Sequence, residues 1–153
     1  MGFKESLHQG CLGELIVRDF FEKQSWCRGV IDLRYDKTFQ EKDIDFMVEN
    51  QTRQFNYVEV KTDFKAHETG NLAYEITTSG HAGCFDKTEA NMIAYYLPES
   101  KELYLIDARG LRNYVYRKQG EPRPMGDNAM GFLIPFKELE RNNLIRAHYK
   151  GVE

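Results

Sequence analysis

The sequence lacks the features that mark several specialised classes of protein. Only 3 of its 153 residues are cysteine, and this odd, scattered set without a Cys-x-x-Cys pair argues against a disulfide scaffold. No apolar run approaches the roughly 20 residues that span a bilayer, and the N-terminal stretch has no apolar signal-peptide segment. The net charge of −3 excludes a protein held to nucleic acid by overall positive charge. These absences predict a soluble, cytoplasmic protein with reduced thiols and no membrane partner.

What the sequence does contain suits a folded domain of ordinary size. Hydrophobic residues make up 41% of the chain and aromatic residues 13%, which is enough to fill a core. A length of 153 residues fits one domain better than two, and there are no internal repeats. We therefore expect residues 1–153 to form a single domain.

The first half of the chain predicts a helix followed by antiparallel strands. Helical spacing runs from about Glu5 to Lys23, and alternation begins after Gly29. Two further alternating segments, residues 43–48 and 55–61, are joined by a polar connection typical of a hairpin. The expected apolar face of the helix consists of Leu7, Cys11, Leu15, Val17, Phe20 and Phe21, and that of a third strand of Leu72, Tyr74 and Ile76.

The second half alternates strands and helices. A capping-box pattern at residues 86–89 predicts the start of a short helix, and apolar runs at 92–97 and 103–106 predict buried strands. Asp107 would cap a helix to about Arg117, and Pro135 suits the first turn of a last helix. The order of elements predicts an α/β or α+β fold with an N-terminal helix and a mixed sheet flanked by helices.

The most informative residues are Asp45, Glu59 and Lys61. In an extended chain Glu59 and Lys61 point to one face, and the hairpin would bring Asp45 beside Glu59. Two adjacent carboxylates repel each other and raise each other's pKa, so such a pair usually needs a cation. Hard oxygen ligands suit Mg²⁺ or Mn²⁺, which bind phosphate oxygens. The pattern therefore predicts metal-dependent hydrolysis of a phosphodiester.

Glu14 is a third acidic candidate. Its neighbours three and seven residues away on the predicted helix are all apolar, so its carboxylate must be paired, protonated or bound to metal. Arg18, four residues further along, offers a simple local ion pair. Both interpretations stay open from the sequence alone.

Together these residues resemble the PD-(D/E)XK phosphodiesterases, a superfamily that includes restriction enzymes, Holliday-junction resolvases and phage nucleases. The resemblance covers about residues 5–80 and consists of the helical Glu14, Asp45 in "KDIDFMV", and Glu59 with Lys61 in "YVEVKTD". It implies a restriction-endonuclease-like core in which Glu14, Asp45, Glu59 and the Val60 carbonyl bind the metal. Lys61 would be the catalytic base or an electrostatic partner. The resemblance also implies a homodimer.

The sequence departs from the family pattern in two ways. The first acid has no proline before it, and Asp43 stands two residues earlier as a rival ligand to Asp45. The following helix lacks the glutamine found at its start in several exonuclease-like branches. This second departure favours a structure-directed or site-directed endonuclease over an enzyme that trims ends.

Further candidates lie outside this set. The third strand is expected to neighbour the Glu59 strand, so Glu75 could join the site from it, and His67 could assist at the scissile phosphate, although both could simply be solvated. His81 and Cys84 have zinc-like spacing, but a structural zinc site normally needs two such pairs. In the more basic half, about residues 86–150, the cations that could contact DNA phosphates are Arg109, Arg112, Arg117 and Lys118; a solvated helix face is the alternative.

The sequence thus predicts a Mg²⁺-dependent or Mn²⁺-dependent DNA endonuclease, acting on duplex or branched DNA in recombination, repair or a phage context. No small-molecule cofactor is expected. One alternative is a nuclease-fold module that binds nucleic acid or protein without catalysis. A third interpretation treats Glu59 and Lys61 as an ion pair in a structural domain.

Overall fold

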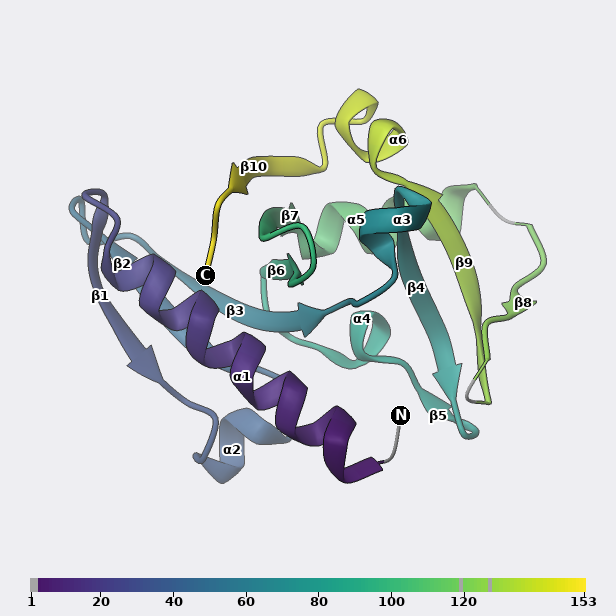
Figure 1. Ribbon diagram of the computed structural model, residues 1–153, viewed down its shortest axis with the longest axis horizontal. Coiled ribbons are helices and arrows are strands. Elements are labelled where there is room, and N and C mark those ends of the chain that lie inside the picture. The colour runs from purple at the N-terminus through teal and green to yellow at the C-terminus, as the bar shows by residue number, and fades with distance from the viewer. Residues whose placement is uncertain (1–2, 119, 127) are drawn as a thin grey trace.

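The computed structural model describes residues 3–118, 120–126 and 128–153, which form two β-sheets and six helices (Figure 1). The central sheet has six strands in the order β1-β2-β3-β6-β7-β10. All its neighbouring strands are antiparallel except β3 and β6, which run parallel. Its strands are β1 (Cys27–Asp32), β2 (Phe46–Asn50), β3 (Phe55–Thr62), β6 (Met92–Leu97), β7 (Glu102–Asp107) and β10 (Ile145–Lys150).

A second, antiparallel sheet of four strands has the order β5-β4-β9-β8. The predicted third strand, with Leu72 and Tyr74 buried, belongs to this sheet, so the expectation that it neighbours the Glu59 strand was wrong. The neighbour of β3 on that side is the parallel strand β6. The strands of the second sheet are β4 (Asn71–Thr78), β5 (His81–Ala82), β8 (Arg123–Pro124) and β9 (Ala129–Pro135).

The helices flank the sheets, and the longest of them crosses the face of the central sheet near β3 and β1 (Figure 1). This arrangement confirms the predicted α/β class with an N-terminal helix and a mixed sheet. None of the described helices has the length and apolar character needed to cross a membrane. The helices are α1 (Phe3–Glu22), α2 (Lys37–Gln40), α3 (Ala66–Thr69), α4 (Cys84–Lys87), α5 (Ala108–Arg117) and α6 (Phe136–Arg141).

Helix α1 meets the sheet with a different face from the one predicted. Val17 and Phe21 are buried as expected, but Leu7 is 60% exposed and Leu15 is 48% exposed. The reason is a close approach at Gly13, where an added methyl group would lie 2.1 Å from Thr62 Oγ1. The glycine side of the helix therefore faces β3, and the leucine stripe turns outward.

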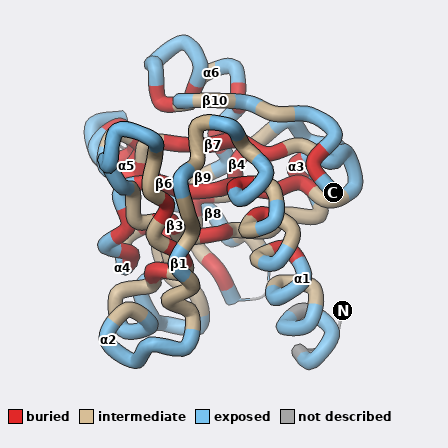
Figure 2. The backbone as a smooth tube through the Cα atoms, turned by 90° about the vertical axis from the view of Figure 1, so that its left-hand side faces the viewer, coloured by how far each residue is buried: buried red, intermediate tan, exposed pale blue. Residues whose placement is uncertain are grey.

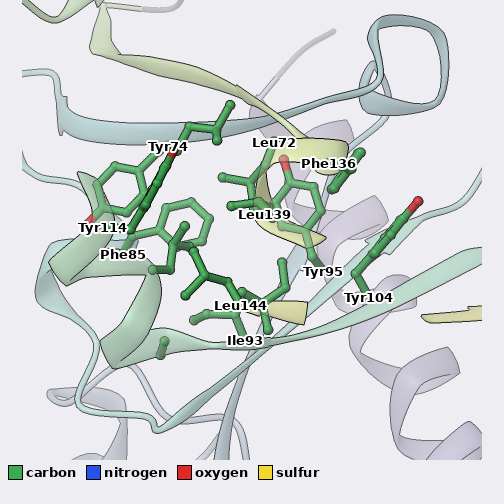
Figure 3. Close-up of a cluster of buried hydrophobic side chains, with 14 of the residues drawn as sticks. Leu72, Tyr74, Phe85, Ile93, Tyr95, Tyr104, Tyr114, Phe136, Leu139 and Leu144 are labelled. Carbon is green, nitrogen blue, oxygen red and sulfur yellow. The ribbon is translucent and has the colours of Figure 1, made fainter. Parts of the chain in front are cut away.

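Two apolar clusters cover the two faces of the central sheet. Between α1 and the sheet lie Val17, Phe21, Phe46, Val58 and Val60. The other cluster fills the space between the central sheet, the second sheet, α5 and α6, and Figure 3 shows its aromatic side chains packed together. Strands β6 and β7 are buried almost throughout (Figure 2). Because strand residues alternate, Glu59 and Lys61 point to the face opposite α1.

The local predictions for the second half had mixed outcomes. Asp107 caps α5 as predicted, with its carboxylate accepting the N–H of Gly110 at 3.2 Å. The capping box at residues 86–89 was wrong: α4 ends there, and Thr88 Oγ1 donates to the carbonyl of Asp43 at 2.6 Å. Pro135 is the residue that precedes α6, and β10 was not anticipated.

Candidate active site

The hairpin of β2 and β3 places Asp45 beside Glu59. Asp45 lies one residue before β2, and its N–H donates to the carbonyl of Val58 at 2.9 Å. Its Oδ2 accepts the N–H of Val60 at 2.8 Å. Glu59 lies between these two valines, and its carboxyl group meets that of Asp45. The backbone of β3 therefore fixes Asp45 in position against Glu59.

The carboxyl groups of this pair are half-buried, and neither forms an ion pair with a described residue. Burial raises the pKa of Asp45 to about 6, although the hydrogen bond from Val60 works against the shift. Burial and the charge of Asp45 raise the pKa of Glu59 to about 10. Glu59 Oε2 is buried and hydrogen-bonds to no described residue. The pair therefore retains a proton at neutral pH unless a cation takes the proton's place.

Asp43 is ion-paired with Lys87, although its charge is close enough to Glu59 to help raise the pKa of that carboxyl group. Its carboxylate lies 3.2 Å from Lys87 Nζ, and its backbone has a φ of 48°, in the left-handed region. Of the two acids that the sequence left as rivals, Asp45 is the one whose carboxyl group meets Glu59.

Glu14 is ion-paired, but with a partner that the sequence did not indicate. Its Oε2 lies 3.1 Å from Nη1 of Arg34, a side chain only 10% exposed. Arg34 also bonds Asp32 at 2.8 Å, while Arg18 pairs with Glu22 and Asp32. Because the local pair between Glu14 and Arg18 does not form, Arg34 is the residue that compensates Glu14.

Arg34 is a component of the site that sequence reasoning missed. It follows β1 at the edge next to Asp45, where the N–H of Leu33 donates to the carbonyl of Asp45 at 2.9 Å. Asp32 and Arg34 are two residues apart, a spacing that puts charged side chains on one face of an extended chain. That spacing, on a strand predicted to precede the hairpin, was the signal available.

The described residues contain no group of three or more His, Cys, Asp or Glu side chains arranged to hold a metal ion. The pair of Asp45 and Glu59 nevertheless fits a hard divalent cation, since Glu59 Oε2 is a buried oxygen without a donor. Mg²⁺ is bound through one or two carboxylates and keeps waters and phosphate oxygens as its other ligands. His81 and Cys84 take part in no such group, so the zinc alternative gains no support.

Lys61 points into a cleft of about 1650 Å³ between β3 and the second sheet. Burial lowers the pKa of Lys61, but the negative charges of an ionised Cys84 and of Glu75, Glu59 and Asp63 raise it by more, so the net shift is upward. The lining of the same cleft includes the acidic residues Glu14, Glu59 and Glu75, the backbone of Val60, and the cations Lys118 and Arg123.

The two additional candidates have different positions. Glu75 lines the cleft, with its Oε2 3.8 Å from Lys61 Nζ. His67 lies on α3, where its Nε2 is 3.6 Å from Glu68, and it is not among the described residues that line the cleft. The structure thus brings Glu75 to the site and leaves His67 outside it.

The four predicted cations of the α5 segment do not form one surface. Arg109 and Arg117 are exposed, whereas Arg112 donates to the carbonyls of Phe85 and Thr88. Lys118 pairs with Glu138 and lies 5.2 Å from the ring centroid of Tyr114. Only Lys118 of these four lines the cleft.

Three comparisons with known proteins complete the description. No protein-family model matches the chain. No curated protein matches it either. Among solved structures, the chain is similar to a bacterial homing endonuclease, I-Ssp6803I, with a TM-score of 0.48 and 14% sequence identity, covering 79% of this chain and 85% of that chain.

Proposed function

We propose that the protein is a divalent-metal-dependent endonuclease of the PD-(D/E)XK type that hydrolyses phosphodiester bonds in DNA. The observation that carries this proposal is the half-buried pair of Asp45 and Glu59, in which the buried oxygen Glu59 Oε2 has no hydrogen-bond partner among the described residues. Withdrawing two adjacent carboxyl groups from water without a cation is costly. Strongly perturbed carboxyl groups are typical of catalytic sites, and Glu59 lines the cleft. The pair would hold Mg²⁺ or Mn²⁺ together with the carbonyl of Val60.

The metal, when bound, supplies an activated water and neutralises charge on the phosphate. Lys61 stays protonated among its acidic neighbours, so we assign it the electrostatic role, donating to a phosphate oxygen, over the role of general base. Glu14 already has a cation, because its Oε2 pairs with Arg34. We therefore expect Glu14 to contribute less to metal binding than Asp45 or Glu59.

DNA is the proposed substrate. Lys118 and Arg123 line the cleft, and Arg109 and Arg117 are exposed on α5, where each could contact a phosphate. A homodimer would supply the two active sites needed to cut both strands of a duplex or a junction. The structure-directed role, in recombination, repair or a phage, follows the sequence resemblance.

Cleavage assays test this proposal directly. Supercoiled, linear, flap and four-way-junction DNA would be incubated with wild type, Asp45→Asn and Asp43→Asn in Mg²⁺, Mn²⁺ or EDTA. We expect metal-dependent products with wild type and with Asp43→Asn, whose carboxylate pairs with Lys87. Asp45→Asn should lose about 4 kcal/mol of transition-state stabilisation, on the order of 10³-fold in rate. Equal cleavage by Asp45→Asn and wild type would refute the assignment.

Metal binding has a readout that does not depend on cleavage. A ligand that binds only the native state at 100 times its Kd stabilises it by about 2.7 kcal/mol. Mg²⁺ or Mn²⁺ should therefore raise the Tm of wild type and of Asp43→Asn, but not of Asp45→Asn/Glu59→Gln. An equal rise in all three proteins would place the metal elsewhere.

A module that binds nucleic acid or protein without cutting is the second candidate. The observation in its favour is that Glu14 is compensated by Arg34 and no three-acid group forms among the described residues. This alternative predicts salt-sensitive DNA binding by wild type with no cleavage of any substrate in either metal. Metal-dependent cleavage that Asp45→Asn abolishes would eliminate it.

A further inference from the structure

The ammonium group of Lys61 is held from the second sheet. Glu75, on β4, lies with Oε2 3.8 Å from Lys61 Nζ, and the same oxygen accepts a hydrogen bond from Thr78 Oγ1 at 3.0 Å. The side chains of Lys61 and Glu75 are 31% and 26% exposed. The pair therefore joins the two sheets across the cleft at the residue that would face the phosphate.

The backbone at Glu75 is confined on two sides. A methyl group on Gly83 would lie 2.0 Å from the carbonyl oxygen of Glu75, and one on Gly131 would lie 2.0 Å from that of Tyr74. The ladder between β4 and β9 is irregular between Glu75 and Thr77. Such bulges redirect side chains and occur often beside active sites. Two glycines and a bulge thus fix where the Glu75 carboxylate points.

We propose that Glu75 is a positioning residue for the hydrolysis, holding the Lys61 ammonium over the cleft beside the pair of Asp45 and Glu59. This role rests on the proposed function. Lys61 has a carboxylate on either side, Glu59 two residues earlier on the same strand face and Glu75 on the opposite sheet. Without the attraction of Glu75, the Lys61 ammonium moves toward Glu59, where it competes with the divalent cation. It then no longer contacts the phosphate of the substrate.

The experiment compares Glu75→Gln, Glu75→Asp and a matched control, Glu102→Gln. Glu102 is also a half-buried strand carboxylate in an ion pair, 2.9 Å from His148. We expect Glu75→Gln to lower kcat by on the order of 10- to 100-fold, with little change in the Kd for uncleaved DNA in EDTA. The Mg²⁺ concentration that gives half of the maximal Tm increase should also be higher for Glu75→Gln than for wild type. Glu75→Asp keeps the charge and should restore part of kcat, while Glu102→Gln leaves kcat unchanged.

A thermal double-mutant cycle shows whether Glu75 acts through Lys61. The change in Tm caused by Glu75→Gln should be smaller in a Lys61→Met background, because the effects of coupled residues are not additive. If Glu75→Gln keeps the wild-type kcat, the role of Glu75 is overturned. The same holds if Glu75→Gln and Glu75→Asp lose kcat equally and the Tm changes of Glu75→Gln and Lys61→Met are additive. Absence of metal-dependent cleavage by wild type would instead overturn the proposed function itself.

Discussion

The charged groups of the β2–β3 hairpin and those of the α5 segment are satisfied in opposite ways. On α5, Arg112 is satisfied by two backbone carbonyls, and Lys118, which follows the helix, is satisfied by Glu138. At the hairpin, Asp45 and Glu59 meet each other, and Glu59 Oε2 has no donor among the described residues. Buried polar groups in folded proteins are almost always satisfied. The unpartnered oxygen of Glu59 is therefore the better indicator of a ligand site, even though α5 carries more charge.

Arg34 combines features of both regions. It forms ion pairs with Glu14 and Asp32, and it lies beside the pair of Asp45 and Glu59. Arg34→Met would leave Glu14 without its cation and Asp32 with Arg18 alone, and the loss of these part-buried charged hydrogen bonds should cost about 1.5–3 kcal/mol. Arg109→Met, on the exposed face of α5, should stay within about 0.5 kcal/mol of wild type. Urea unfolding measures the free energies of unfolding of both variants. A loss below 1 kcal/mol in Arg34→Met would mean that Glu14 is solvated and free to bind metal.

The carboxyl pair predicts a pH dependence in EDTA. Because the pKa of Glu59 in the folded protein, about 10, is above its ordinary value, the folded state binds more protons than the unfolded state between these values. Stability should therefore be greatest below about pH 4 for this group, and should fall as pH rises toward 10. Glu59→Gln should remove most of this slope and stabilise the metal-free protein at pH 9 by about 2–3 kcal/mol.

Glu102→Gln is the control for this titration, because the pKa of Glu102 is lowered in the folded protein by hydrogen bonds and by His148 despite its partial burial. Its contribution has the opposite sign: it is present above the ordinary glutamate pKa and is lost in acid. If Glu59→Gln and wild type unfold with the same pH slope, Glu59 ionises in the folded protein without a cation, and the main support for the metal site disappears.

Arg112 shows what a cation of α5 does when it serves the fold. Its N–H groups reach the carbonyls of Phe85 and Thr88 at the end of α4. Arg112→Met leaves these carbonyls unpaired and should cost about 2 kcal/mol, in the range for hydrogen bonds to charged groups. Affinity for DNA, measured at a temperature where the variant is folded, should not change. If Arg112→Met instead binds DNA more weakly and keeps its stability, Arg112 contacts DNA, as the sequence predicted.

The sequence was sufficient for the parts of the site that depend on local alternation. The hairpin register follows from the alternation around Asp45 and Glu59, since a slip of either strand by one residue would turn its acid to the α1 face and turn Phe46 or Val58 away from that face. The cap at Asp107 is equally local. These features need only the neighbouring residues along the chain, and the structure agrees with both.

The parts that could not be predicted depend on how closely distant segments approach. Nothing local indicates that Gly13 lies against Thr62, although this contact turns Leu7 and Leu15 outward. Likewise, Glu75 reaches Lys61 from a different sheet, although the alternation alone made its strand look like a neighbour of β3. Single-sequence patterns report which face of an element is apolar, but not what the face meets.

The smallest effect on stability, and the most specific on binding, is expected from Arg117→Ala. Arg117 is exposed at the end of α5, so its loss should leave the free energy of unfolding within about 0.5 kcal/mol of wild type. If it contacts a phosphate, DNA binding weakens to a similar extent for all sequences, and the slope of log K against log salt decreases by about 1. Fluorescence anisotropy in EDTA at several salt concentrations measures this slope, with Arg112→Met as the contrasting variant. An unchanged slope in Arg117→Ala would make α5 a solvated face, so that Lys118 and Arg123 in the cleft would be left as the cations that bind DNA.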